Sequence, residues 1–233
     1  DIGDLLMRSP VAPDRQLLGQ SITGKDVLVT GAGGSIGTEL CRQILAQRPR
    51  RLVLFEMTAA ALFAIDGELR RMQDQLSPDT EVVAELGTLE NPRTVERLFE
   101  RWKPHTVFHA AAYKHVPMVE SNMVAGISNN VFGTLNAALA ARDNMVERFV
   151  LISTDKAVRP TNVMGATKRI CELVLQALAA ERDHRTVFTM VRFGNVLGSS
   201  GSVVPQFQAQ IAAGGPVTVT HREVTRFFMT IKE

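Results

Sequence analysis

An acid and a base stand next to each other in the run Ser153-Thr154-Asp155-Lys156, directly after an apolar stretch. A neighbouring acid and base can exchange protons with one bound substrate, which suits an elimination reaction. A further lysine, Lys168, follows twelve residues after Lys156. Taken alone, an Asp-Lys pair is also typical of a solvated loop, so its interpretation depends on where the fold places it.

A glycine-rich turn is a second chemical feature, and it predicts a phosphate site. Gly31, Gly34 and Gly37 follow the apolar run Val27–Thr30 in the spacing G-x-x-G-x-x-G, because Ile36 takes the place that the last glycine of G-x-G-x-x-G would need. Glycine allows a tight turn and lets a pyrophosphate approach the N–H groups at the start of a helix. We therefore expect a nucleotide cofactor to contact Gly31, Gly34, Ser35, Ile36 and Gly37.

A carboxylate at the end of the next apolar run supports the same prediction. Glu56 lies nineteen residues after Gly37. An acid at this position accepts hydrogen bonds from the ribose hydroxyls of adenosine and repels a 2′-phosphate. Glu56 therefore favours NAD, whereas NADP stays open because Arg51 and Arg70 lie nearby in the sequence.

The elements that must position these residues alternate between short apolar strands and longer amphipathic helices. The predicted strands are Val27–Thr30, Leu52–Phe55, Glu81–Ala84, Thr106–Ala110, Phe149–Ser153 and Val187–Phe193. The predicted helices are Ser35–Gln47, Thr58–Gln75, a segment opening at Asn91-Pro92, Ala125–Asp143 and Met164–Arg182. This alternation predicts an α/β protein with a doubly wound parallel sheet of the Rossmann type, whose ligands bind at the carboxyl ends of the strands.

The domain organisation follows from the same pattern. Residues 1–24 are weakly patterned and carry Pro10 and Pro13, so we expect a linker or arm. Residues 25–193 are the predicted dinucleotide-binding domain, and residues 194–233 are the expected start of a substrate-binding region that is incomplete. We expect the chain to be part of a longer protein.

Composition excludes several classes of function. Of 233 residues, 26 are basic and 24 acidic, so no nucleic-acid-binding surface is expected. With only two cysteines, Cys41 and Cys171, the chain is not a disulfide scaffold, and both thiols are expected to be buried. No apolar run reaches the roughly 18–20 residues that span a bilayer. His105 and His109 flank a strand without a cluster of further ligands, so no metal site is expected.

Four motifs in order resemble nucleotide-sugar 4,6-dehydratases of the extended short-chain dehydrogenase/reductase superfamily. They are the glycine turn and the segments His109–Pro117, Ser153–Arg169 and Arg192–Pro205. The resemblance implies dehydration of a UDP-N-acetylhexosamine, above all UDP-N-acetylglucosamine, to a 4-keto-6-deoxy sugar nucleotide for surface polysaccharide or glycan synthesis. It also implies a tightly bound, recycled NAD or NADP and a homo-oligomer. The chain would then be the cytoplasmic domain of a protein anchored to a bacterial inner membrane through parts absent from this sequence.

One departure from the superfamily decides how the chemistry is assigned. Most members place a tyrosine four residues before the helix lysine, but here Met164 precedes Lys168, and the only tyrosine is Tyr113. Methionine has no proton to exchange. The resemblance therefore implies Lys156 as the base at the sugar C5 and Asp155 as the acid for the C6 hydroxyl, with Asp155 also taking the 4-hydroxyl proton. Thr154 would bond the substrate near C4, Lys168 would hold the cofactor, and Met164 would shape the site.

The resemblance also implies supporting residues. The family's third strand usually ends in Gly-Asp, whereas here Gly87 is followed by Thr88, whose hydroxyl would face the adenine. Cofactor contacts are expected at Thr88, Leu89, Ala110, Ala111, Ala112 and Lys168. Substrate contacts are expected at Lys114, His115, Asn195 and Arg226, and Asn130 is expected to tie a central helix to the active-site strand.

Two alternatives stay open. A sugar-nucleotide epimerase would use the same 4-keto intermediate and retain the C6 oxygen. A non-catalytic nucleotide-binding module would have kept the fold and lost the tyrosine, although the presence of Asp155, Lys156 and Lys168 speaks against it.

Overall fold

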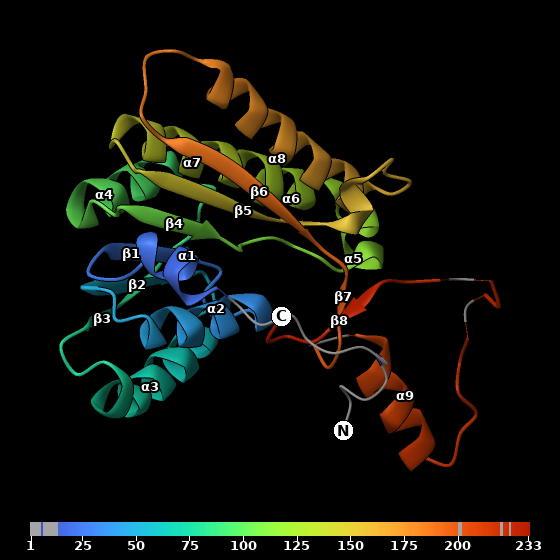
Figure 1. Cartoon of the computed structure of the whole chain (residues 1–233). Coiled ribbons are helices and arrows are strands. Elements are labelled where there is room, and N and C mark those ends of the chain that lie inside the picture. The colour runs from blue at the N-terminus through green and yellow to red at the C-terminus, as the bar shows by residue number, and fades with distance from the viewer. Residues whose placement is uncertain (1–5, 7–13, 200–201, 220, 224) are drawn as a thin grey trace. The chain divides into compact units, whose positions relative to one another are not determined.

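The computed structural model describes residue 6 and residues 14–199, 202–219, 221–223 and 225–233. Of the described residues, the larger unit contains 14–192, and the smaller unit contains residue 6 and those from Phe193 onwards. The larger unit is built on a six-stranded sheet in the order β3-β2-β1-β4-β5-β6 (Figure 1). This is the strand order of the doubly wound Rossmann fold, so the predicted fold class is confirmed. The strands are β1 (Asp26–Thr30), β2 (Arg51–Glu56), β3 (Glu81–Leu86), β4 (Thr106–His109), β5 (Arg148–Thr154) and β6 (Val187–Phe193).

Helices cover both faces of this sheet. One face carries α2 (Ser35–Ala46) and α3 (Ala59–Leu76), and the other carries α4 (Pro92–Trp102), α7 (Gly133–Asp143) and α8 (Val163–Ala180). All five residues of β1 are buried, because helices cover both faces of the sheet. Val27 and Val29 pack with α2 and α3, whereas Leu28 packs with α4, α7 and α8, since successive side chains of a strand point to opposite faces.

The chain between β4 and α7 differs from the prediction of a single helix over Ala125–Asp143. It forms α5 (Val116–Ser121), α6 (Met123–Ile127), a π-helical turn (Ser128–Phe132) and then α7. A π turn is rare and is frequently found at functional sites. It carries Asn130, whose side chain leaves the helix to bond the backbone of Tyr113. Periodicity alone does not reveal such a contact.

Two further regions were predicted incompletely. Within the expected arm 1–24, helix α1 (Arg15–Gln20) begins at Asp14, whose carboxylate accepts hydrogen bonds from the N–H groups of Gln16 and Leu17. In the smaller unit, β7 (Asn195–Val196) pairs in parallel with β8 (Phe228–Met229), and α9 covers Val203–Ala212. These elements are too short or too weakly periodic to stand out in the sequence.

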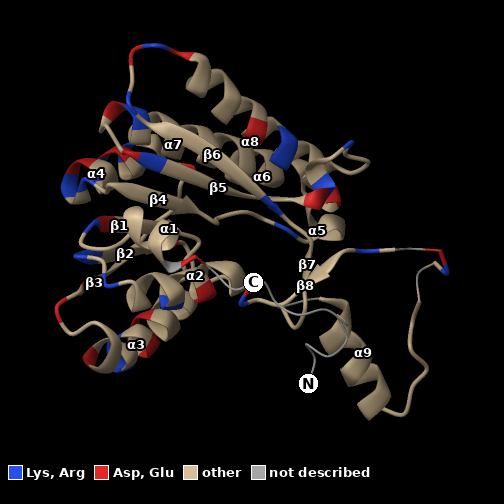
Figure 2. Ribbon diagram, in the orientation of Figure 1, with Lys and Arg blue, Asp and Glu red and all other residues tan. Residues whose placement is uncertain are grey.

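Charges of both signs are mixed on the surface of the larger unit. Lys and Arg are interspersed with Asp and Glu along α3 and α4 in the view of Figure 2. None of the described helices is both long and apolar enough to cross a membrane. Cys41 and Cys171 are buried, as predicted, and burial raises the pKa of each thiol.

His109, at the end of β4, links β1 and α7 through hydrogen bonds in the core. Its side chain is fully buried; Nδ1 lies 2.7 Å from the hydroxyl of Thr30 and Nε2 lies 2.9 Å from the hydroxyl of Thr134. Thr134 donates its own proton to the carbonyl of Asn130, so it accepts from Nε2–H, and Thr30 donates to Nδ1. Both ring nitrogens are thus occupied. Among the described residues, no group of His, Cys, Asp or Glu side chains is arranged to hold a metal ion.

Helix α8 packs on the turn that follows β5, the 3-10 turn Asp155–Ala157. A Cβ added to Gly165 would lie 2.3 Å from the carbonyl oxygen of Lys156. Only glycine allows this approach, so Gly165 sets the spacing between the helix and the turn.

Burial of His109 predicts how acid affects stability. Burial, together with the charge of Lys168, lowers the pKa of His109 from 6.5 to about 3. Between these two pKa values the unfolded chain binds a proton that the folded chain does not. The contribution of neutral His109 to the free energy of unfolding is therefore fully present above pH 6.5 and is lost as the pH falls towards 3. Between pH 7 and pH 5 the free energy of unfolding of the wild type should fall by about 2 kcal/mol more than that of His109→Gln, whose amide does not titrate, as measured by urea unfolding. Equal pH dependence of both proteins would contradict the assignment of a neutral His109.

The contact at Gly165 predicts a pair of opposite stability changes. Gly165→Ala should lower the free energy of unfolding by about 1–3 kcal/mol because the new methyl group overlaps the Lys156 carbonyl. Gly67→Ala is the matched control within α3, where the nearest atom is 3.8 Å from the new Cβ, and it should stabilise by about 0.5–1 kcal/mol. Thermal and urea unfolding measure both. A stabilised Gly165→Ala variant would rule out the close packing.

Candidate active site

The glycine turn between β1 and α2 depends on glycine at two of the predicted positions. Gly31 has a φ of +67°, and a Cβ there would lie 2.7 Å from the backbone of Ala111. A Cβ at Gly37 would lie 2.0 Å from the carbonyl oxygen of Gly31. The first contact brings the turn against the chain after β4, and the second lets α2 start directly behind β1.

Gly33, which the sequence analysis left out, is a third position of this kind. A Cβ there would lie 2.5 Å from the Cβ of Ala61 at the start of α3. At Gly34 the same substitution meets only an ordinary contact of 3.4 Å. Gly34 instead serves as the N-cap of α2, where it leaves the helix N-terminus without a capping side chain. The doubled glycine was the available signal for Gly33.

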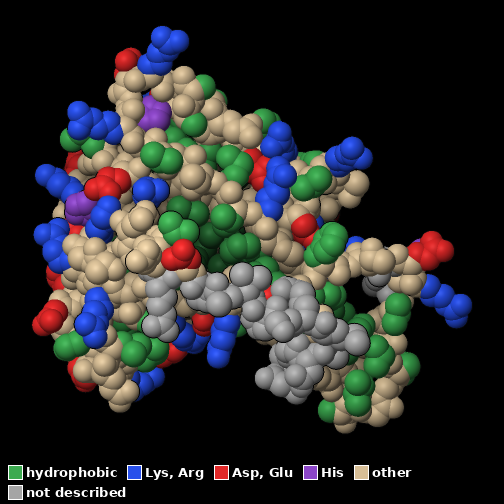
Figure 3. Space-filling model, viewed as in Figure 1, with side chains coloured by type: hydrophobic (Ala, Val, Ile, Leu, Met, Phe, Trp, Pro, Cys, Tyr) green, Lys and Arg blue, Asp and Glu red, His purple; other side chains and the backbone are tan. Residues whose placement is uncertain are grey.

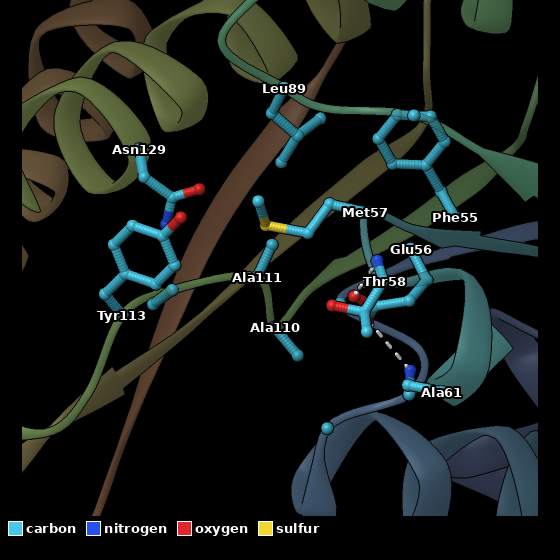
Figure 4. Close-up of a pocket in the computed structure, with 15 residues that line it drawn as sticks. Phe55, Glu56, Met57, Thr58, Ala61, Leu89, Ala110, Ala111, Tyr113 and Asn129 are labelled. Carbon is cyan, nitrogen blue, oxygen red and sulfur yellow. Dashed lines mark hydrogen bonds between the residues drawn. The ribbon is translucent and has the colours of Figure 1, made fainter. Parts of the chain in front are cut away.

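A first cavity of about 270 Å³ lies between this turn and the ends of β2 and β4 (Figure 4). Glu56 is 8% exposed and lines it, accepting hydrogen bonds from the N–H groups of Gly33 at 3.1 Å and Thr58 at 2.9 Å. A carboxylate has further lone pairs for ribose hydroxyls. Figure 4 shows Met57 reaching towards the middle of the cavity, with Tyr113 and Asn129 across from Glu56. Of the predicted cofactor residues, the cavity brings together Gly31, Gly34, Glu56, Leu89, Ala110, Ala111 and Ala112.

Three residues with a bearing on cofactor preference lie elsewhere. Arg51 donates to Glu81 from the start of β2, and Arg70 pairs with Asp66 on α3; neither lines the cavity. Thr88 also falls outside the lining, and its hydroxyl accepts a hydrogen bond from the N–H of Glu90. Its neighbours Gly87 and Leu89 line the cavity instead. No lysine or arginine is among the described residues that line it.

A second cavity of about 560 Å³ adjoins the start of α2. It brings the predicted residues Ser35, Ile36 and Gly37 together with Lys114 and His115. Lys114 is the only lysine or arginine among the described residues lining this cavity, and burial lowers the pKa of its ammonium group. Residues of α5 and α6 complete the wall, and sequence analysis did not predict them. Hydrophobic side chains gather above α2 in the middle of the face shown in Figure 3.

Tyr113 lines both cavities, although it occupies no position of the superfamily's tyrosine motif. Its backbone is held by Asn130, which accepts from its N–H at 2.7 Å and donates to its carbonyl at 3.0 Å. Asn130 also donates to the hydroxyl of Thr167, next to Lys168, at 3.0 Å. Asn130 therefore ties the rim of the cavities to α8. The contact with the active-site strand that the resemblance implies for Asn130 stays a prediction.

The acid and the base after β5 form one hydrogen-bonded group with Thr154. The Thr154 hydroxyl donates to Asp155 Oδ1 at 3.0 Å and accepts from the N–H of Lys156 at 3.3 Å. Nζ of Lys156 donates to the same Oδ1 at 3.1 Å, and both side chains are 29% exposed. The pair is therefore accessible to a ligand and ordered by its neighbour.

The helix residues behind this group are buried. Met164 is 3% and Lys168 4% exposed, and neither lines the two cavities described above. Burial lowers the pKa of Lys168, whereas Cys171 and Glu172 act to raise it. Gly165 links this helix to Lys156, as described above. Asn195 and Arg226 lie in the smaller unit, and their predicted substrate contacts stay predictions.

This arrangement can do two things chemically. The glycine turn and the open N-terminus of α2 fit a diphosphate, because a side chain at Gly31 would close the approach and none blocks the helix end. The Thr154-Asp155-Lys156 group offers an acid and a base at the carboxyl end of a parallel strand, where open α/β sheets bind ligands.

Comparisons with known proteins agree with this geometry. The family model for polysaccharide biosynthesis proteins matches residues 27–233. The capsular polysaccharide biosynthesis protein CapD of Staphylococcus aureus is 48% identical over the whole chain, which spans 38% of CapD. Curated relatives also include proteins named UDP-glucose 4-epimerase from Rickettsia species.

Solved structures show the same fold. Pen from Bacillus thuringiensis has a TM-score of 0.82 and 34% identity, covering 91% of this chain and 65% of Pen. DesIV of Streptomyces venezuelae, a dTDP-glucose 4,6-dehydratase, has a TM-score of 0.73 at 21% identity, covering 88% of this chain and 68% of DesIV. The second comparison bears on the fold alone. The chain belongs to the family of polysaccharide biosynthesis proteins, with a fold of the extended short-chain dehydrogenase/reductase type.

Proposed function

We propose that the protein containing this chain is an NAD-dependent 4,6-dehydratase of a UDP-N-acetylhexosamine, most specifically of UDP-N-acetylglucosamine. The observation that carries the proposal is the contact between Asp155 and Lys156 at the end of β5, in a chain whose superfamily tyrosine position holds Met164. The 4-keto-6-deoxy product would serve surface polysaccharide or glycan synthesis, in keeping with relatives that are named for polysaccharide biosynthesis.

A nicotinamide cofactor supplies, when bound, an acceptor for the C4 hydride and later its donor to C6. The chain would hold its diphosphate at the glycine turn and its adenosine ribose at Glu56. NAD is favoured over NADP because a carboxylate, and no lysine or arginine, lines the first cavity among the described residues. Lys168 would bond the nicotinamide ribose. Tight binding suits a cofactor that is recycled within each turnover.

The residues after β5 would move the protons so that atoms balance. Asp155 accepts the proton of the 4-hydroxyl as the C4 hydride leaves, and it later gives this proton to the departing C6 hydroxyl, which is released as water. Lys156 would act as the neutral amine: it takes the C5 proton, which the new 4-ketone has acidified, and returns a proton to C5 when hydride reaches C6. Thr154 orients Asp155 and bonds the sugar near C4. The net change is the loss of one water.

Further properties of the whole protein are part of the same proposal. Lys114 and His115 would contact the UDP-sugar from the second cavity, and Asn195 and Arg226 would do so from the smaller unit. We propose a homo-oligomer whose membrane contact, at the bacterial inner membrane, would come through parts outside residues 1–233. An epimerase is the second candidate, because relatives named UDP-glucose 4-epimerase match most of the chain. Its product would keep the mass of the substrate.

Variants of the acid and the base test the proposal. Asp155→Asn and Lys156→Ala should each lower kcat for the 4-keto-6-deoxy product by at least about 100-fold, because each removes a proton-transfer group. Cofactor content should stay near that of the wild type. Mass spectrometry and NMR of the product, with UDP-N-acetylglucosamine as substrate, measure both the rate and the loss of water.

A matched control is available at the end of α7. Arg142 and Asp143 are also adjacent, with Nε and Oδ1 2.8 Å apart, and Asp143→Asn should leave turnover unchanged. Full turnover by both Asp155→Asn and Lys156→Ala would refute the assignment. Loss of activity together with loss of cofactor would point to a folding defect and against a role confined to proton transfer.

Cofactor preference is tested at Glu56. Glu56→Gln removes the negative charge that repels a 2′-phosphate. It keeps one acceptor oxygen for the N–H groups of Gly33 and Thr58, which bond different oxygens of the carboxylate. The ratio of the Kd for NADP to that for NAD should fall by about tenfold, or roughly 1.4 kcal/mol. Glu81→Gln, which removes the charge of an exposed carboxylate on β3, is the control. Isothermal titration of both cofactors measures the ratio, and tighter binding of NADP than NAD by the wild type would overturn the proposed preference.

A further inference from the structure

Glu172 is a buried carboxylate on α8 that the proposed proton transfers do not use. Its side chain is fully buried and accepts four hydrogen bonds. Oε1 accepts from the hydroxyl of Ser153 at 2.7 Å and from Nε of Arg192 at 2.8 Å. Oε2 accepts from Arg192 Nη2 at 2.6 Å and from Arg169 Nη1 at 2.9 Å. Every contact to this group is therefore strong and directional.

The charge state of Glu172 is fixed by these contacts. Burial alone would raise the pKa of the carboxyl, but the hydrogen bonds from Arg192, Ser153 and Arg169 outweigh it and lower the pKa to about 2. Glu172 is therefore ionised at any pH used to measure activity. The two arginine side chains keep 36% and 41% exposure, so they stay hydrated when Glu172 changes.

A buried ion pair of this kind contributes little net stability, since desolvation offsets much of the attraction. The position of Glu172 in the fold indicates a different role. Ser153 directly precedes Thr154, so the bond to Glu172 holds the residue just before the Thr154-Asp155-Lys156 group. Glu172 also lies one helical turn after Lys168 and shares its face of α8. The third partner, Arg192, is the last residue of the larger unit.

We infer that Glu172 is a positioning residue, which fixes Ser153 and thereby holds Thr154, Asp155 and Lys156 in register with Lys168 on α8. The inference rests on the proposed dehydratase function for its catalytic consequence. Its structural part, the ordering of the turn after β5 by the Glu172–Ser153 bond, stands without that function.

The test compares two variants with a matched control. Ser153→Ala removes only the hydroxyl that reaches Glu172, and Glu172→Gln retains the side-chain shape but removes the charge. Asp26→Asn is the control: Asp26 is 2% exposed and is paired through both oxygens with Arg50, but it lies at the opposite, amino end of the strands. It should lower the thermal midpoint without changing turnover or the turn after β5.

Two readouts separate positioning from general stability. Hydrogen–deuterium exchange of a peptide covering residues 153–157 should become faster in Ser153→Ala and Glu172→Gln, and not in Asp26→Asn. In the intact enzyme, kcat should fall by on the order of 10- to 100-fold with KM within about twofold. With substrate deuterated at C5, the isotope effect on kcat should increase, because proton removal by Lys156 has become slower. Ser153→Thr, which keeps a hydroxyl, should restore most of the rate.

The outcomes are distinct. Unchanged exchange over residues 153–157 in both variants would overturn the inference, as would a loss of kcat in Asp26→Asn equal to that in Glu172→Gln. If the wild type forms no 4-keto-6-deoxy product, the proposed function fails, whereas the exchange measurement still decides whether Glu172 orders the turn.

Discussion

Helix α8 and the end of strand β5 are held together by contacts that leave little freedom to either element. Gly165 lies against the carbonyl of Lys156, and the buried carboxylate of Glu172 holds Ser153. Asn130 adds a hydrogen bond from the π turn to Thr167. These contacts fix Lys168 relative to Asp155 and Lys156. Because proton transfer requires heavy atoms within hydrogen-bond reach, the proposed chemistry depends on this one interface.

Met164 occupies the position of the superfamily tyrosine, so another group must transfer the proton in the proposed reaction. Met164 is buried at the start of α8 and cannot exchange a proton. The residues proposed for that task are Asp155 and Lys156, which contact each other and stay partly exposed. The single tyrosine, Tyr113, is placed at the rim of the two cavities by Asn130, where its ring shapes the space for a ligand. The proposed proton transfer and the shape of the cavities thus belong to different parts of the sheet edge.

Sequence patterns predicted the parts of the structure that repeat at short range. The buried strands and the helices α2, α3, α4 and α8 follow from apolar periodicity, and Gly31 and Gly37 follow from their spacing in the turn. Glu172 and the lining by Tyr113 could not be found in this way, because each is defined by a partner elsewhere in the chain, Ser153 and Asn130 respectively. Gly33 was signalled only by the doubled glycine, because its close partner, Ala61, lies in α3. The π turn was missed for the same reason, since its contact with Tyr113 leaves no trace in periodicity.

The fate of the C4 hydrogen tests the central claim most directly. The intact protein should be incubated with UDP-N-acetylglucosamine that carries deuterium at C4, and the product should be analysed by NMR and mass spectrometry. Dehydration with a retained cofactor predicts deuterium in a C6 methyl group and a product lighter by one water. Deuterium that stays at C4 in a product of unchanged mass would contradict the account and identify an epimerase instead.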